Sequence, residues 1–273
     1  MTYMKDPKSA ADLLFTKRHQ LFLNFDEHTD QSENAILYLN TQLSKLASTL
    51  SSTSQFNYLD VGCGFGQKTL AIINTIQAYC LIKTIALDPS HELLSLFKNE
   101  ISDQSIDLFP STWEEYQPNI QFDFISSFHT FYYIDHWQFA ISKMLDALKL
   151  NGQICIALRS IDPVCQFKDY FYSKIYDDRR RERNSDELCE LLIKLNIEYQ
   201  IDYVDSLLDI RDCLEKNKKG RQLLEFILRQ PYEKLADFED EIILYLKKIE
   251  NNGYLMQRDA YIWISNQEKG KLS

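Results

Sequence analysis

Glycine is scarce in this sequence, and its few copies are placed unevenly. Only seven glycines occur in 273 residues, yet three of them, Gly62, Gly64 and Gly66, lie within five positions. Glycine permits backbone angles and close approaches that a Cβ atom forbids. We detect no internal repeat and no low-complexity tract. We therefore expect the rest of the chain to be organised around the glycine cluster.

Long apolar runs and paired metal-binding residues are also missing. No stretch approaches the ~20 apolar residues that a membrane-spanning helix needs, and the first residues carry no apolar signal region. The six cysteines form no C-x-x-C motif, and no histidine lies at metal-ligand spacing from any of them. These absences predict a cytoplasmic protein with reduced cysteines, no bound metal and no membrane partner.

Positive charge is in deficit as well. The formal net charge is −10 and the sequence pI is about 5.0. Binding to phosphate backbones requires a concentrated basic surface, so we expect no nucleic-acid partner. The apolar fraction of 45% is ordinary for a globular protein. The length predicts one large domain, or one core with an appended subdomain.

The residues around the glycine cluster have the pattern of a buried strand that turns sharply into a helix. Tyr58–Val61 is an apolar run interrupted by Asp60, and a helical apolar pattern begins near Gln67. The first N–H groups of such a helix would face a ligand. A dinucleotide fingerprint would need its third glycine at position 67, and no G-x-x-x-x-G-K-[ST] phosphate loop is present.

Strand and helix patterns alternate beyond this turn, which predicts a parallel sheet. Helices are expected near 67–77, 91–100 and 136–149, and Asn151-Gly152 is expected to turn into the fifth strand. Right-handed crossovers then give a doubly wound, Rossmann-like α/β fold. The five expected strands are 56–61, 81–87, 106–108, 122–127 and 153–158.

Further helical patterns flank this core. Helices are predicted at 8–22 and 31–50, with a polar turn at 24–30 between them. The C-terminal part has a strand near 197–204, two helices at 219–229 and 233–249, and a last strand at 255–264. We therefore divide the chain into N-terminal helices, a central core, a C-terminal region that returns to the sheet, and a tail, at 1–50, 51–160, 161–265 and 266–273.

The run D-V-G-x-G-x-G at Asp60–Gly66 resembles the first motif of class I S-adenosylmethionine-dependent methyltransferases. The resemblance implies a seven-stranded sheet, S-adenosylmethionine as cofactor and S-adenosylhomocysteine as product. In that family the glycine turn packs under the methionine and ribose portions of the cofactor. The implied cofactor contacts lie at the ends of the strands: Asp60, Gly62, Gly64, Gly66, Asp88, Pro89, Ser111, Thr112, Trp113 and Phe128.

Individual roles follow from the same resemblance. Asp88 would accept hydrogen bonds from both ribose hydroxyls, and its alternative role is a helix cap. Ser111 or Thr112 would reach the adenine amine, with Trp113 as a ring contact. The equally weighted alternative is that Trp113 is a core residue at the start of a capped helix. The backbone of Phe128 would face the cofactor.

A second resemblance, to the histamine N-methyltransferase family, spans nearly the whole chain in patches. It includes 122–134, 184–199, 207–213 and 260–264. It implies that residues 1–50 and 161–265 bind the acceptor and that the protein is a monomer. The implied acceptor contacts include Glu27, or Asp26 with a shifted gap, and His129 and Gln257 where the family has amides. The others are the aromatic residues Tyr132, Tyr133 and Phe171.

These features predict a methyltransferase that acts on the nitrogen of a small, histamine-like amine. His129 would accept a proton and Glu27 would orient a protonated amine. Each of these two residues has an alternative structural role: His129 would be a core histidine, and Glu27 would be a helix cap. Other acceptors on the same fold would be a hydroxyl, a carboxyl group or a peptide side chain. A catalytically silent binding protein and a dinucleotide oxidoreductase are weaker alternatives.

Overall fold

The computed structural model describes residues 19–48, 55–101, 106–175 and 183–266. Within these ranges no helix has the length and apolar character needed to cross a membrane. The expected helix at 8–22 falls largely on residues outside the described part, as does the tail at 266–273.

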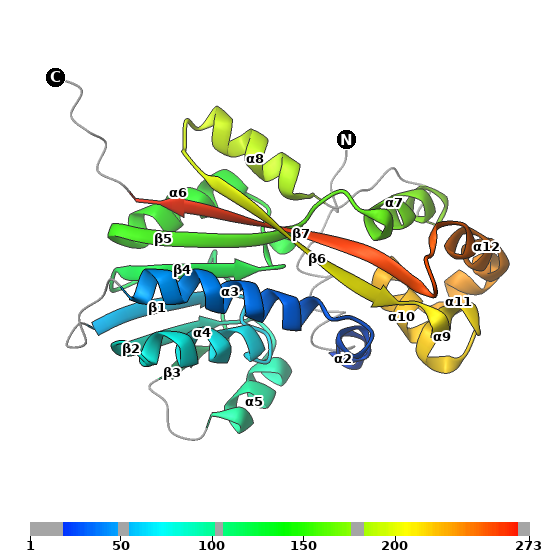
Figure 1. The fold of residues 1–273 in the computed structure, drawn as a ribbon, viewed down its shortest axis with the longest axis horizontal. Helices are drawn as coiled ribbons and strands as arrows, with labels where there is room; N and C mark the ends of the chain where they lie inside the picture. Colours follow the sequence, from blue (N-terminus) through cyan, green and yellow to red (C-terminus); the bar gives the residue numbers. More distant parts are fainter. Residues whose placement is uncertain (1–18, 49–54, 102–105, 176–182, 267–273) are drawn as a thin grey trace. The chain divides into compact units, whose positions relative to one another are not determined.

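Seven strands form one mixed sheet in the order β3-β2-β1-β4-β5-β7-β6 (Figure 1). The pairs β1–β2, β1–β4, β2–β3 and β4–β5 are parallel. This order confirms the predicted doubly wound, Rossmann-like sheet. The strands are β1 (Gln55–Val61), β2 (Leu81–Leu87), β3 (Ile106–Phe109), β4 (Phe122–Phe128), β5 (Leu148–Arg159), β6 (Gln200–Asp209) and β7 (Tyr254–Ser265).

Helices connect and flank these strands. A hydrogen bond of 2.7 Å from Thr75 to Asn40 holds α4 beside α3, whereas α6 lies on the opposite face of the sheet (Figure 1). The helices are α2 (His19–Glu27), α3 (Gln31–Ala47), α4 (Gln67–Gln77), α5 (His91–Glu100), η2 (Phe131–Tyr133), α6 (Trp137–Ala147), α7 (Pro163–Ile175), α8 (Ser185–Lys194), α9 (Arg211–Leu214), α10 (Lys218–Leu228), α11 (Tyr232–Leu235), η3 (Ala236–Phe238) and α12 (Glu239–Ile249).

The chain separates into two compact units. The first takes its described residues from Met1–Asn34, Arg159–Asn184 and Val204–Asp259, and the second takes them from Ala35–Leu158, Ser185–Tyr203 and Ala260–Ser273. The second unit therefore contains β1 to β5 and the glycine cluster. The first contains α2, α7 and the helices α9 to α12.

The second unit is built on a large apolar core on its strands and helices. Leu59, Ile125 and Ile154 are fully buried at the centre of the sheet, and Ile141 and Met144 of α6 pack against the same cluster. Burial of a side chain of this size stabilises the fold by roughly 1.5–3 kcal/mol. The core holds the carboxyl ends of β1, β2 and β4 in fixed positions.

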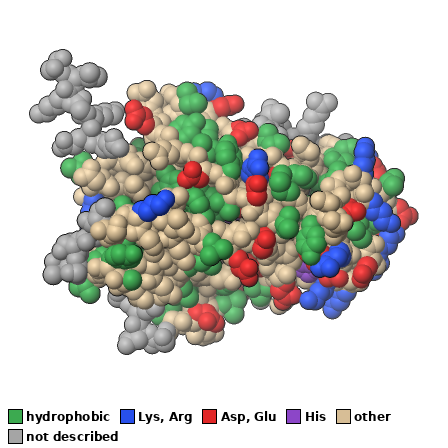
Figure 2. Space-filling view, in the orientation of Figure 1, with side chains coloured by type: hydrophobic (Ala, Val, Ile, Leu, Met, Phe, Trp, Pro, Cys, Tyr) green, Lys and Arg blue, Asp and Glu red, His purple; other side chains and the backbone are tan. Residues whose placement is uncertain are grey.

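The first unit has its own core, which Phe167, Leu223, Leu228 and Ile242 help to form. Its surface over α9 to α12 carries acidic and basic side chains that are interspersed rather than separated by sign (Figure 2). Lys216, for example, lies 2.5 Å from Asp240 across this surface. Exposed ion pairs of this kind add little to stability.

Several element boundaries differ from the sequence prediction. Helix α2 continues through Glu27, where a turn from residue 24 was predicted, because Phe25 extends its buried face. Strand β5 begins at Leu148, so Asn151-Gly152 lies inside it, and Asn151 takes a left-handed backbone with φ 63°. The single helix predicted at 233–249 is broken into α11, η3 and α12.

Helix α7 was not predicted at all. Its residues Val164, Phe167 and Phe171 are buried and lie at helical spacing. Asp162 accepts a hydrogen bond of 2.7 Å from the backbone N–H of Cys165, so it caps the helix. An aspartate followed by proline is a standard start signal for a helix, and this signal was available in the sequence.

Candidate functional site

The three clustered glycines form the turn between β1 and α4 in the second unit. All three have positive φ, at 83°, 57° and 85° for Gly62, Gly64 and Gly66. The N–H groups of Gly62 and Cys63 donate to the carbonyl of Leu87 at 2.8 and 2.9 Å. The loop is therefore fixed to the end of β2, and its shape depends on residues without a Cβ atom.

The space beside these glycines differs from one position to the next. A Cβ atom at Gly62 would lie 2.0 Å from Oγ1 of Thr130, so this glycine is required by packing. A Cβ atom at Gly64 would meet no atom within 4 Å. Gly64 has a positive φ and also borders open space, which is the arrangement that a ligand approaching the backbone requires. The loop therefore fits a bound cofactor at Gly64.

Replacing Gly64 by alanine is expected to lower the affinity for S-adenosylhomocysteine at least tenfold, because the methyl group enters the open space that the ligand needs. The left-handed backbone adds a stability cost of about 1–2 kcal/mol. Gly253→Ala is the matched control, since Gly253 has a φ of 84° but lies in the first unit. Calorimetric titration should show unchanged affinity for the control. Equal affinities of the two variants would contradict the assignment.

Asp88 follows β2 and is 7% exposed. Its Oδ2 accepts a hydrogen bond of 2.9 Å from the N–H of Gly64, and its Oδ1 accepts one of 2.8 Å from the N–H of Ser90. Burial raises the pKa of this carboxyl group to about 6, against the opposing effect of the two N–H donors. A carboxylate offers about four acceptor positions, so two remain after these bonds. Asp88 therefore braces the loop and can still accept hydroxyl donors.

Asp60 lies beneath the glycine loop and is 2% exposed. Its Oδ1 accepts a hydrogen bond of 2.7 Å from Ser126, and its Oδ2 accepts one of 2.6 Å from Thr69. Burial raises the pKa of Asp60, although both hydroxyl donors oppose the rise. The carboxyl group thus joins β1, β4 and the first turn of α4. This bracing role is visible in the structure, and direct contact with a cofactor stays a prediction.

The residues after β3 divide into two groups. Trp113 is 3% exposed, and its indole N–H donates to the carbonyl of Ala140 at 3.2 Å. This burial favours the alternative in which Trp113 is a core residue. Ser111 and Thr112 are half-buried, and Thr112 Oγ1 accepts a hydrogen bond of 3.3 Å from the N–H of Glu115. Their predicted contact with an adenine ring stays a prediction, as does that of the exposed Pro89.

The segment that leaves β4 places His129 in an unusual conformation. Its φ is 57°, a left-handed angle that is uncommon outside glycine and that asparagine, aspartate and histidine adopt more often than other residues. The N–H of His129 donates to the carbonyl of Ala157 at 2.9 Å, and its Nδ1 lies 3.2 Å from the hydroxyl of Tyr132. The ring of the preceding residue, Phe128, is buried and lies 6.1 Å from that of Tyr261.

Thr130 joins this segment to the glycine loop. Its Oγ1 lies 3.2 Å from the carbonyl of Phe128 and 3.4 Å from that of Gly62. The sequence analysis missed Thr130, because no motif marks a threonine after a strand and its packing partner is 68 residues away. The structure therefore brings His129, Tyr132 and Tyr133 together beside the loop that carries Gly62 and Gly64.

The remaining predicted residues belong to the first unit. Glu27 is exposed and lies 3.1 Å from the ammonium of Lys219. Gln257 is fully buried between Thr29 and Arg159. With its amide oriented so that both ends are satisfied, its oxygen accepts hydrogen bonds from Arg159 at 2.6 and 3.0 Å and its nitrogen donates to Thr29 at 2.9 Å. Phe171 is fully buried in the core of the unit. A contact of these residues with an acceptor stays a prediction.

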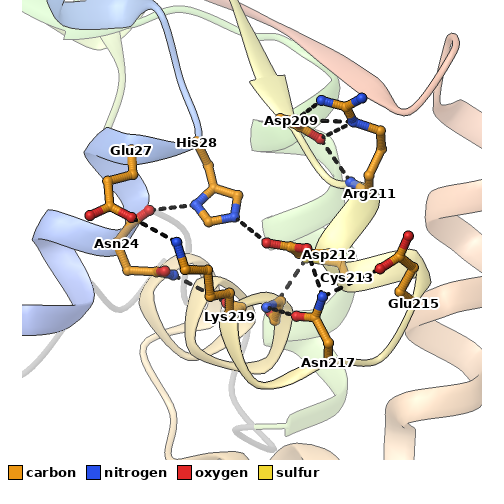
Figure 3. A network of polar contacts seen from close by, with 11 residues as sticks. Asn24, Glu27, His28, Asp209, Arg211, Asp212, Cys213, Glu215, Asn217 and Lys219 are labelled. Carbon is orange, nitrogen blue, oxygen red and sulfur yellow. Dashed lines mark hydrogen bonds and ion pairs between the residues drawn. The ribbon is translucent and has the colours of Figure 1, made fainter.

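A polar network that was not predicted surrounds His28 in the first unit (Figure 3). The Nδ1 of His28 lies 2.6 Å from the carbonyl oxygen of Asn24, and its Nε2 lies 2.9 Å from the carboxylate of Asp212. Asn217 donates a further hydrogen bond of 2.6 Å to Asp212. Asp212 lies 184 residues from His28, so no local sequence pattern could reveal the pair. The network ties the end of α2 to α9 and to the start of α10.

We expect Asp212→Ala to lower the stability of the protein by about 1–3 kcal/mol, because the buried ring of His28 loses a charge-assisted partner. Asn217 first and His28 second hold the pKa of Asp212 below its usual value. The ionised carboxylate of Asp212 therefore stabilises the folded protein at pH values above the unfolded pKa, which is near 3.9. This stabilisation is lost as the pH falls through the lower pKa of the folded state. The difference between wild type and variant should therefore shrink below about pH 4.

Thermal unfolding measured from pH 3.5 to 8 tests this expectation. Asp240→Ala is the matched control, since Asp240 also lies beside a basic side chain, that of Lys216, but is itself 95% exposed. The control should melt with the wild-type protein at every pH. If the Asp212→Ala variant has the same melting temperature as the control at every pH, the network does not stabilise the unit.

Comparison with known proteins points to the same class of protein as the order of the strands and the glycine loop do. The family model described as a methyltransferase domain matches residues 15–200. The chain is 22% identical over 267 residues to histamine N-methyltransferase of Rattus norvegicus, covering 89% of this chain and 88% of that protein. It is 28% identical over 147 residues to malonyl-[acyl-carrier protein] O-methyltransferase 2 of Ilyobacter polytropus. This match covers 47% of this chain and 56% of the relative, so the chain spans about half the length of that relative.

Among solved structures, the plantazolicin methyltransferase BpumL in complex with SAH aligns with a TM-score of 0.55 at 15% identity, over 93% of this chain and 94% of that one. This likeness supports the fold. The chain belongs to the methyltransferase domain family. It is a class I methyltransferase whose cofactor is S-adenosylmethionine and whose cofactor product is S-adenosylhomocysteine.

Proposed function

We propose that the protein transfers a methyl group to the nitrogen of a small amine that resembles histamine. The observation that carries the proposal is the position of His129, which leaves β4 beside the glycine loop with Tyr132 and Tyr133 next to it. An imidazole can accept a proton near neutral pH, and tyrosine rings attract organic cations. The overall similarity to a histamine N-methyltransferase supports the same acceptor class.

The cofactor residues are proposed from the same unit. Gly64 leaves room for the cofactor, and Gly62 and Gly66 shape the loop. Asp88 accepts the hydroxyl hydrogens of the ribose through the acceptor positions that Gly64 and Ser90 do not use. Cofactor binding would thus depend on the existing geometry of the loop rather than on a new arrangement.

The bound cofactor supplies an activated methyl group on a sulfonium. The protein contributes alignment, because a reaction between two held partners avoids most of the entropy cost of their encounter. His129 takes one proton from a protonated acceptor nitrogen, so that its lone pair becomes available. The neutral nitrogen would then take the methyl group as the methyl–sulfur bond breaks, and the sulfonium would become the thioether of S-adenosylhomocysteine. His129 afterwards returns the proton to water.

A second candidate acceptor is a hydroxyl or carboxyl group. The partial similarity to a malonyl-[acyl-carrier protein] O-methyltransferase supports it, although that similarity covers 47% of the chain. His129 would then accept the proton of a hydroxyl group. The two candidates differ in the element that carries the new methyl group.

Mass spectrometry of reactions with S-adenosylmethionine separates these candidates. The protein would be incubated with histamine and related amines, and in parallel with matched alcohols and carboxylates. N-methylated amine with release of S-adenosylhomocysteine is the expected result. Methylated alcohol or carboxylate in the absence of any methylated amine would overturn the amine proposal in favour of the second candidate.

A further inference from the structure

We propose that Tyr132 positions His129 for catalysis: its hydroxyl oxygen accepts a hydrogen bond from Nδ1–H of His129 and so leaves the lone pair of the imidazole on Nε2. The proposal rests on the proposed role of His129 as proton acceptor. It adds a second residue, which acts through the first and need not touch the acceptor itself.

The geometry of the pair supports this assignment. The Nδ1 of His129 lies 3.2 Å from the hydroxyl of Tyr132, which is within hydrogen-bonding distance. The two rings are nearly parallel, with an interplanar angle of 21° and centroids 6.2 Å apart. Because Tyr132 lies in the short helix η2 only three residues after His129, the contact is local and does not depend on distant segments.

The backbone holds both members of the pair in place. His129 is fixed by its hydrogen bond to Ala157 at 2.9 Å, and the N–H of Tyr133 donates to the carbonyl of Thr130 at 2.9 Å. The indole of Trp137 donates to the carbonyl of Phe131 at 2.7 Å, which secures η2 from the other end. The left-handed angle of His129 is thus imposed by several contacts.

The chemical consequence concerns the two nitrogens of a neutral imidazole. One carries a proton and the other carries a lone pair. The hydroxyl of Tyr132 can either donate to Nδ1 or accept from it, and we assign the proton to Nδ1. With the proton on Nδ1, the lone pair lies on Nε2. This atom is buried in the structure, so an acceptor ammonium would reach it by displacing the atoms that cover it. Proton transfer from the acceptor ammonium to Nε2 gives an imidazolium and a neutral amine, so one proton moves and no charge is lost.

Tyr133 provides a matched comparison within the same short helix. Its ring stands edge-on to that of Tyr132, with an interplanar angle of 87° and centroids 6.2 Å apart. Tyr133→Phe removes a hydroxyl from the neighbouring residue and leaves the hydroxyl of Tyr132 in place. Tyr132→Phe removes only the atom that contacts Nδ1. The two variants therefore separate the hydrogen bond from a general effect of losing a tyrosine hydroxyl.

The first test measures the tautomer of His129 directly and needs no acceptor. The full chain is labelled with ¹⁵N-histidine, and the ring signals of His129 are assigned by their absence in His129→Asn. Above the titration range of the ring, the wild-type protein and Tyr133→Phe should carry the proton on Nδ1. Tyr132→Phe should shift the population toward Nε2–H. A wild-type proton on Nε2, or equal populations in the wild type and Tyr132→Phe, would overturn the proposal.

The second test measures turnover with the amine identified by mass spectrometry. Tyr132→Phe should lower kcat about three- to tenfold, the range expected for one neutral hydrogen bond, with little change in KM. Its pH profile should shift relative to the wild type, whereas that of Tyr79→Phe, at an exposed tyrosine that follows α4, should not. An unchanged profile in Tyr132→Phe counts against the proposal. Failure to methylate any amine would overturn the proposed function alone, because the tautomer measurement still decides the role of Tyr132.

Discussion

Asp88→Asn binds S-adenosylhomocysteine about 100-fold more weakly than the wild-type protein at pH 8. The carboxylate of Asp88 already accepts N–H donors from Gly64 and Ser90, and the proposed ribose contact uses its remaining acceptor positions. Hydrogen bonds to a charged group contribute about 1.5–3 kcal/mol each, and 100-fold corresponds to about 2.7 kcal/mol. An asparagine has one oxygen, so its amide nitrogen would also face an N–H donor of the loop.

The same contact makes cofactor affinity depend on pH. Burial raises the pKa of Asp88 to about 6 in the folded protein. Ribose hydroxyls donate to the ionised carboxylate, so binding favours the deprotonated form. Affinity should therefore be constant above about pH 7 and should fall as pH drops through 6, by up to tenfold per unit. Asp88→Asn should lose this dependence.

Isothermal titration calorimetry from pH 5 to 8 checks both expectations. Asp107→Asn is the matched control, because Asp107 is an exposed aspartate on the neighbouring strand β3. Its affinity and pH dependence should equal those of the wild type. Thermal melting of each variant establishes that the fold is retained. Wild-type affinity in Asp88→Asn would remove Asp88 from the cofactor site.

The second large effect is expected for His129→Asn. Asparagine tolerates the left-handed backbone at φ 57°, so the change removes the imidazole with little added strain. Loss of a general base lowers turnover by about 100- to 10,000-fold. The cofactor contacts proposed at Gly64 and Asp88 remain intact. Turnover should therefore fall while the affinity for S-adenosylhomocysteine stays within twofold.

His136→Asn is the control for this variant, since His136 is exposed and precedes α6. Turnover of the control should equal that of the wild type. A His129→Asn protein that keeps most of its turnover would assign the proton to another group. A large loss of cofactor affinity in the same protein would instead indicate that His129 supports the loop.

The sequence predicted the fold and the glycine turn between β1 and α4 because both depend on local patterns. Glycines at alternate positions after a buried strand limit the backbone to one kind of turn, and Asp88 is marked by its place after the next strand. The positive φ of all three clustered glycines agrees with that interpretation.

Features that depend on contacts between distant residues could not be predicted in the same way. Thr130 packs on Gly62 only because β4 lies beside β1 in the sheet. His28 meets Asp212 across 184 residues. Phe171 is fully buried in the core of the first unit, and its predicted contact with an acceptor stays a prediction, because an aromatic side chain in a sequence has the same appearance in a core and in a binding site.

The small number of glycines provides the most direct test of the central claim, that the cofactor binds at the glycine loop of the second unit. Protein labelled selectively with ¹⁵N-glycine has seven glycine amides. Titration with S-adenosylhomocysteine should shift the signals of Gly62, Gly64 and Gly66 and leave those of Gly220 and Gly253 in place. Unchanged loop signals at saturating S-adenosylhomocysteine would contradict the account.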